Sequence, residues 1–125
     1  MKAQELGLNT CWVGVTHGKN AAKVNSDEKV VIVIALGYGA NQGIPHKNKQ
    51  LAAISNITEN LTDWYAKGIE AALLAPTAMN QQKFSFVLEG DTVKLNPGKG
   101  SYTMLDYGIV KYHFEIASGH KVQLG

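Results

Sequence analysis

The chain has 125 residues, a length that suits one domain with a single core. Its net charge of +2 is too small to indicate nucleic-acid binding. All 12 basic residues are lysines, so bidentate guanidinium recognition of a phosphate is excluded within the chain. A single cysteine, Cys11, fits a reducing compartment. Because there is no apolar run long enough to span a membrane and no signal peptide, we expect a cytoplasmic protein without membrane or nucleic-acid partners.

The first half of the chain predicts little regular structure. The elements expected there are the end of a helix at 2–8, an extended segment at 10–14, a short helix at 17–24, and a loop at 38–49. The Val- and Ile-rich run at 29–37 is typical of a strand buried on both faces. Since a domain rarely begins with only the end of a helix, we expect the chain to be the C-terminal part of a longer one.

The second half is more strongly patterned. Thr62 fits the N-cap of a helix at 63–74, whose small residues let another element approach closely. Alternating residues at 83–89 pair with 92–95 through Gly90-Asp91 as a hairpin. A last helix, from 102 or 103 to 118, ends at Gly119. Its expected buried stripe is Leu105, Ile109, Tyr112 and Ile116, and Gly108 is expected to pack. These elements predict a mixed α+β fold.

Three patterns resemble reactive sites but match them poorly. The loop at 36–43 follows a strand as a dinucleotide-binding G-x-G-x-x-G does, yet Gln42 replaces the third glycine and no helix follows. Cys11 and His17 lack a third group to orient them, so we favour a buried, inert thiol. His113 lies two helical turns from Asp106, too far for direct contact. The four histidines and one cysteine show no zinc spacing, so no metal is expected.

Two polar segments carry more information. His46, Lys47 and Lys49 place three potentially cationic groups within four residues, which could hold a phosphate or form a solvated charge run. The loop at 75–82 places three amide side chains between a helix and a strand. Because each amide offers donors and an acceptor, such a loop could bind the edge of a heterocycle. A plain helix-to-strand turn is the alternative.

Four segments resemble the FMN-dependent nitroreductase family. The loop, written Ala75-Pro76-Thr77-Ala78-Met79-Asn80-Gln81-Gln82, resembles that family's A-P-S-x-x-N-x-Q-P-W motif, with Lys83-Phe84 in place of Pro-Trp. Residues 6–14 (LGLNTCWVG) are similar to its L-G-L-G-T-C-W-I-G segment. Residues 30–49 are similar to a strand and basic segment near the flavin phosphate, and 105–109 (LDYGI) to the start of the central helix. Together these segments cover most of the chain.

The order of the segments indicates one branch of this family. The T-C-W segment precedes the A-P-T loop, as in the putative TM nitroreductase branch, in which one chain carries two nitroreductase-like halves. The resemblance implies a nitroreductase-like α/β sandwich, with a mixed sheet flanked by helices, present as a partial domain. Residues 1–50 would end a first half, 51–61 would be a linker, and 62–125 would belong to a second half. The family's R-R-S-x-R motif is absent from the sequence. A homodimer, or an intramolecular pseudo-dimer with a missing N-terminal half, is implied.

The resemblance also implies a cofactor site. Backbone groups of Gly14 and Val15 would approach flavin N5 and O4, and Lys47, with His46 or Lys49, would approach the phosphate. The isoalloxazine would be flanked by Pro76, Thr77, Ala78 and Asn80. FMN would pass hydride from NAD(P)H to a nitroaromatic or quinone-like small-molecule acceptor, without a side-chain acid or base, so no catalytic residue is assigned. The alternative is a non-catalytic flavin- or ligand-binding or dimerisation half-domain.

Overall fold

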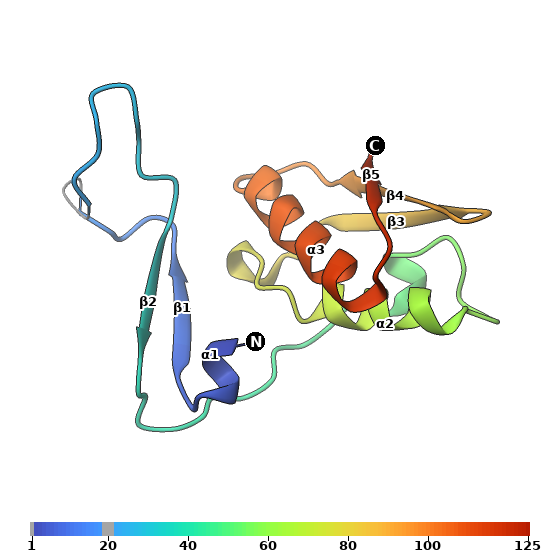
Figure 1. Ribbon diagram of the computed structural model, residues 1–125, viewed down its shortest axis with the longest axis horizontal. Helices are drawn as coiled ribbons and strands as arrows, with labels where there is room; N and C mark the ends of the chain where they lie inside the picture. Colours follow the sequence, from blue (N-terminus) through green and yellow to red (C-terminus); the bar gives the residue numbers. More distant parts are fainter. Residues whose placement is uncertain (1, 19–21) are drawn as a thin grey trace. The chain divides into compact units, whose positions relative to one another are not determined.

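The computed structural model describes residues 2–18 and 22–125 (Figure 1). The chain divides into two compact units, Met1–Pro45 and His46–Gly125. The division falls within the predicted loop at 38–49, just before the basic residues begin. The interpretation of the chain as parts of two nitroreductase-like halves stays a prediction.

The first unit contains helix α1 (Lys2–Glu5) and an antiparallel pair of strands, β1 (Asn9–Val13) and β2 (Val33–Gly37). The predicted helix end and extended segment are confirmed. The predicted helix at 17–24 partly falls on 19–21, outside the described residues, and the remaining residues of that range are not helical. The elements of this unit are therefore few and short.

Two burial predictions for the first unit are wrong. Within β2, Ile34 and Leu36 are 47% and 61% exposed, although the strand was expected to be buried on both faces. In the described chain β2 pairs with β1 alone, and a two-stranded ribbon has too few residues to cover its own faces. For the same reason Cys11, predicted to be buried, lies exposed on β1.

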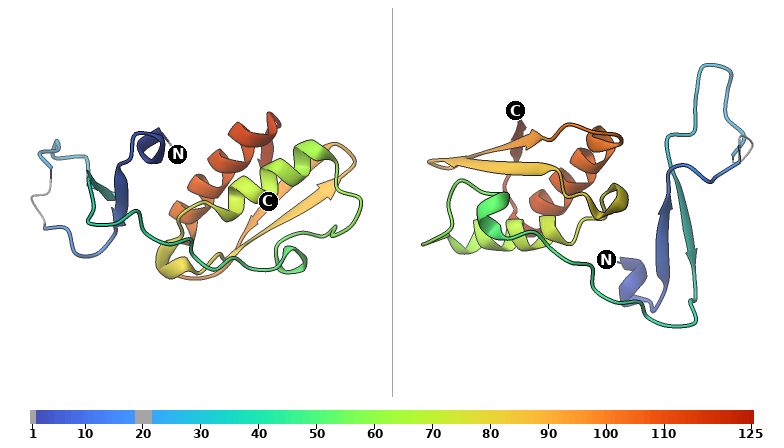
Figure 2. Two further views of the ribbon diagram at one scale, coloured as in Figure 1. Left: turned by 90° about the horizontal axis from the view of Figure 1, so that it is seen from below. Right: turned by 180° about the vertical axis from the view of Figure 1, so that it is seen from behind.

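The second unit has two layers (Figure 2). Helices α2 (Asp63–Leu73) and α3 (Thr103–Ser118) cover one face of a sheet of β3 (Phe84–Glu89), β4 (Thr92–Pro97) and β5 (Val122–Leu124). Strands β3 and β4 are antiparallel, whereas β4 and β5 are parallel, so the sheet is mixed. Short 3-10 turns, η1 (Leu51–Ala53) and η2 (Ala78–Asn80), complete the unit. The predicted mixed α+β class is confirmed.

The core of the second unit lies between its sheet and its helices. Phe86 of β3 and Phe114 of α3 are fully buried and stack with ring centroids 4.8 Å apart. Gly68 of α2 faces the Phe114 ring, which confirms the close approach predicted for the small-residue face of this helix. The remaining fully buried large apolar side chains are Tyr65, Ile54, Leu95, Val93 and Val110. Burial of such side chains supplies most of the stability of a domain of this size.

The buried stripe predicted for α3 is only partly right: Leu105 is half-buried and Ile109 packs against the core, but the last two members of the stripe are exposed. Tyr107, Val110 and Phe114 face the core, whereas Tyr112 and Ile116 are 63% and 54% exposed. The helix carries two apolar stripes at helical spacing, and only the contacts with α2 and the sheet decide which one is buried. Gly108 is exposed, with open space where its Cβ would lie, so the expectation that it packs is also wrong.

The segment expected to be a linker, 51–61, is packed against the sheet. Ile54 is fully buried, and its carbonyl accepts a hydrogen bond of 2.7 Å from Phe86 N. Asn56 N donates in turn to Phe86 O at 3.2 Å. These bonds add a short parallel bridge at Ser55 to the edge of β3. The compact unit therefore includes this segment.

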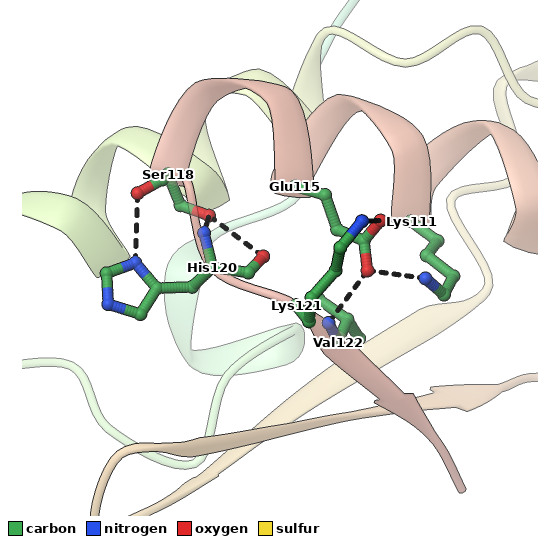
Figure 3. A network of polar contacts seen from close by, with 6 residues as sticks. All are labelled: Lys111, Glu115, Ser118, His120, Lys121 and Val122. Carbon is green, nitrogen blue, oxygen red and sulfur yellow. Dashed lines mark hydrogen bonds and ion pairs between the residues drawn. The ribbon is translucent and has the colours of Figure 1, made fainter.

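The C-terminal strand β5, which was not predicted, is held by a polar network (Figure 3). The Glu115 carboxylate accepts a hydrogen bond of 2.9 Å from Val122 N and pairs with the ammonium groups of Lys111 and Lys121. Helix α3 ends at Gly119, as predicted, and this residue has a left-handed backbone. The His120 ring then stacks on Trp64 with ring centroids 3.9 Å apart. A three-residue strand gives too weak a pattern to identify from sequence.

Candidate functional site

The candidate site joins two segments of the second unit, the basic segment 46–49 and the amide loop 75–82. The amide loop begins where α2 ends and turns through η2 before β3. Met79, Asn80 and Gln82 have φ values of 51°, 52° and 44°, in the left-handed region. Each such non-glycine residue costs about 1–2 kcal/mol. The loop therefore needs compensating bonds to keep its shape.

Gln82 supplies several of these bonds. Its side chain is buried, with an exposed fraction of 2%. Its Oε1 accepts a hydrogen bond of 2.9 Å from Lys49 N. Its Nε2 donates to Lys47 O and to Asn80 Oδ1, each at 2.7 Å. A buried amide is stable only when its donors and acceptor are satisfied, so Gln82 ties the two segments together.

Asn80 adds a second connection between the segments. Its Nδ2 donates to Lys47 O at 2.8 Å, and its Oδ1 lies 2.6 Å from His46 Nδ1. Because an amide oxygen only accepts, the His46 contact requires a proton on Nδ1. Lys47 O thus accepts hydrogen bonds from both Asn80 and Gln82, and these two bonds hold its peptide group in place.

Asp106, in the first turn of α3, anchors the other side of the amide loop. Its carboxylate is buried and accepts hydrogen bonds from Ala78 N at 2.9 Å and from Gln81 Nε2 at 2.6 Å. Gln81 Nε2 also donates to Ser101 O at 3.0 Å. The sequence analysis considered Asp106 beside His113 and within the LDYGI segment, and it missed this role. An acidic residue at a helix N-terminus is a signal that could have drawn attention to it.

The cations of the basic segment differ in their surroundings. The ammonium group of Lys49 donates to Gln82 O at 2.8 Å. Among residues 2–18 and 22–125, no hydrogen-bond or ion-pair partner is found for the ammonium group of Lys47, which is exposed. The ammonium group of Lys47 therefore offers a donor for an external anion, whereas the Nδ1 proton of His46 is used by Asn80 and Lys49 serves the protein itself.

The structure places five of the predicted site residues in the two joined segments. It does not give the loop amides the ligand-facing role that was expected of them. Asn80 contacts His46 and the Lys47 carbonyl, and Lys49 contacts Gln82. Thr77 belongs to the same loop, where its Oγ1 accepts from Gln82 N at 3.1 Å. Pro76 and Ala78 are half-buried in the same loop. Gly14 and Val15 follow β1 in the first unit, and their role stays a prediction. The amides of Asn80, Gln81 and Gln82 were expected to face a ligand, but all three bond within the protein.

A model of the family described as "Putative TM nitroreductase" matches residues 1–118. The chain belongs to this family. It is also similar in fold to the crystal structure of a putative nitroreductase from Thermotoga maritima, with a TM-score of 0.69 and 21% sequence identity. The match covers 90% of this chain and 46% of that one, so this chain spans about half the length of that structure. No curated protein sequence matches the chain.

The nitroreductase-like fold predicted from the four segments is thereby confirmed. In the described part of this nitroreductase-family chain, no three His, Cys, Asp or Glu residues gather as a metal site would require. None of the helices described has the length and apolar character needed to cross a bilayer.

Proposed function

We propose that the protein is an FMN-dependent NAD(P)H oxidoreductase of the nitroreductase type, acting on nitroaromatic or quinone-like acceptors. Membership of the family over residues 1–118 is the observation that carries this proposal. When bound, FMN would supply the hydride-transfer chemistry between the nicotinamide and the acceptor. The protein has to bind and orient the cofactor and exclude competing reactions, and no acid or base side chain is needed.

The donor set of the basic segment fits the phosphate end of FMN. Lys47 provides a point charge, and His46, the residue before it, is held by the contact of its Nδ1 with Asn80; both residues are at the surface. Lys49 Nζ contacts the Gln82 carbonyl and strengthens the scaffold beneath them. Phosphate contact through lysine also agrees with the lack of arginine in the sequence.

The ring end of the proposed site depends on groups other than the loop amides. Pro76, Thr77 and Ala78 form a half-buried rim, and the Met79 side chain beside them is 87% exposed. These groups offer van der Waals contact to an isoalloxazine, and Asn80 would act by shaping the rim. We propose that a second subunit, or the other half of a longer chain, completes the site. The 46% coverage of the matched structure supports that arrangement.

Purification of the full-length natural protein tests the proposal. We expect a yellow protein with a visible flavin spectrum, or a colourless protein that binds added FMN. Anaerobic addition of NADH or NADPH should bleach the flavin band, and addition of a nitroaromatic compound or a quinone should restore it. A protein that stays colourless and does not bind FMN in a titration would contradict the proposal.

A non-catalytic flavin-binding or dimerisation half-domain is the second candidate. The internal hydrogen bonds of Asn80, Gln81 and Gln82 favour it, because a site whose amides are already satisfied discriminates poorly between ligands. Bound flavin that neither NADH nor NADPH reduces would support this candidate. Flavin reduction at a rate that sustains turnover would exclude it.

A further inference from the structure

We infer that Gln82 is a positioning residue that holds the basic segment in the conformation in which Lys47 meets the phosphate of FMN. This inference rests on the proposed FMN-binding function. It assigns to the buried amide a part in cofactor binding that involves no contact with the cofactor. Its basis is the set of bonds that the Gln82 side chain makes to residues on both sides of Asn48.

The Gln82 amide imitates a neighbouring strand. Its Nε2 donates to the carbonyl of Lys47, and its Oε1 accepts from the N–H of Lys49 two residues later. A residue in an adjacent parallel strand makes this same pair of bonds to the residues before and after its partner. One side chain therefore gives the basic segment the support that a sheet would give, at a place where no strand is present in the described structure.

The remaining contacts reinforce the same peptide groups. Lys47 O accepts a second hydrogen bond, from Asn80 Nδ2, so both of its lone pairs are occupied. The Lys49 ammonium returns to the Gln82 carbonyl at 2.8 Å. The backbone on both sides of Asn48 is thus fixed, while the ammonium group of Lys47 is exposed. Fixing this backbone in advance lowers the conformational entropy that phosphate binding would otherwise cost.

The test compares FMN with riboflavin, which has the same ring system and lacks the phosphate. Dissociation constants for both are measured by titration calorimetry on the full-length chain, for wild type, Gln82→Met, Lys47→Ala and Val110→Ala. Gln82→Met removes the amide at nearly constant volume. Val110 is fully buried in the core and belongs to neither the amide loop nor the basic segment, so its truncation is a control for lost stability.

We expect Gln82→Met and Lys47→Ala each to weaken FMN binding about tenfold or more. Riboflavin binding should not change in Lys47→Ala and should weaken much less than FMN binding in Gln82→Met, where the amide loop also loses the bond to Asn80. Val110→Ala should change neither affinity. In the free protein, amide hydrogen exchange at Lys49 should become faster in Gln82→Met but not in Lys47→Ala. This second readout separates loss of the Lys49 hydrogen bond from loss of the cation.

Other results overturn the inference. An equal loss of FMN and riboflavin affinity in Gln82→Met, or no loss of either, would show that Gln82 does not act on the phosphate. If Gln82→Met does not fold, Gln82→Glu replaces it and is measured at low and high ionic strength, since salt screens the added charge but does not restore the lost donor. An FMN affinity restored by salt would then contradict the inference. A wild-type protein that binds neither flavin would instead overturn the proposed function itself.

Discussion

Gly68 and Phe114 are in such close contact that a Cβ atom on Gly68 would lie 2.5 Å from Cε2 of the ring. The ring is fully buried and stacked on Phe86, so it has little freedom to move away. The packing of α2 against α3 therefore depends on the absence of a side chain at this position.

Gly68→Ala should destabilise the protein by about 1–3 kcal/mol, because overpacking exceeds the gain in helix propensity. Gly108→Ala is a matched control on α3, where the added Cβ meets open space, and it should stabilise the protein by about 0.5–1 kcal/mol. Urea unfolding followed by circular dichroism measures both. Similar unfolding midpoints for the two variants would contradict the close contact.

Asp106→Asn should loosen the amide loop. One of the two acceptors that face Ala78 N and Gln81 Nε2 becomes a donor, which leaves a buried group unpaired at a cost of about 1–3 kcal/mol. Amide exchange at Ala78 should become faster than in wild type. Asp63→Asn, at an exposed position in the first turn of α2, should cost much less. A loss of stability in Asp106→Asn no greater than the loss in Asp63→Asn would disprove the anchoring role of Asp106.

Glu115→Gln should weaken the attachment of β5 to the rest of the unit. The Glu115 side chain is 14% exposed and bonds to Lys111 and to Val122 N, so loss of its charge should cost about 1 kcal/mol. Glu89→Gln breaks a more exposed pair with Lys94 and should have a smaller effect. Amide exchange within β5 and the unfolding midpoint report the two changes. Unaltered exchange in β5 would show that Glu115 does not hold the strand.

The same carboxylate should make stability fall in acid. Burial raises the pKa of Glu115, but hydrogen bonds from Lys111 and Val122 and the charge of Lys111 lower it more, so the net pKa is below 4.5. The stabilisation is then complete above pH 4.5 and is lost as the pH falls through the folded-state pKa. Unfolding midpoints measured across this range should drop less steeply in Glu115→Gln than in wild type.

His113 should also make stability fall in acid, in a pH range above that of Glu115. Burial lowers the pKa of its imidazole below 6.5, although the hydrogen bond with the Ala71 carbonyl acts in the opposite direction. The unfolded state therefore binds the proton more readily, so stability is complete above pH 6.5 and decreases as the pH falls through the folded-state pKa. His113→Gln should show no such decrease. If the stability of wild type and of His113→Gln changes with pH in the same way, His113 does not cause the decrease.

Local signals in the sequence were sufficient for most of the second unit. Gly90-Asp91 between two alternating segments predicted the hairpin, and Gly119 predicted the end of α3. Both are backbone features that depend on a few adjacent residues. Burial was predicted less well, because Tyr112 and Tyr107 stand on opposite apolar stripes of one helix and only tertiary contacts choose between them.

The candidate site shows the same limit. The sequence identified the basic segment and the amide loop as polar and unusual. It could not show that hydrogen bonds from Lys49 N and Lys49 Nζ join that residue to Gln82, 33 residues later. The amide side chains of Gln82 and Asn80 match a backbone as well as they match a ligand. Which partner they take depends on the path of the chain, and that path is a property of the whole fold.

The left-handed backbone at Met79 has an evolutionary consequence. The shape of the loop is maintained by Gln82, Asn80 and Asp106, while the side chain of Met79 is 87% exposed and is not needed for that shape. Substitutions at residue 79 by side chains that tolerate a left-handed backbone can therefore change the chemistry of the rim while its geometry persists. Under the proposed function, divergence in acceptor preference can begin at such a position, because selection for folding restricts its backbone conformation and not the chemistry of its exposed side chain.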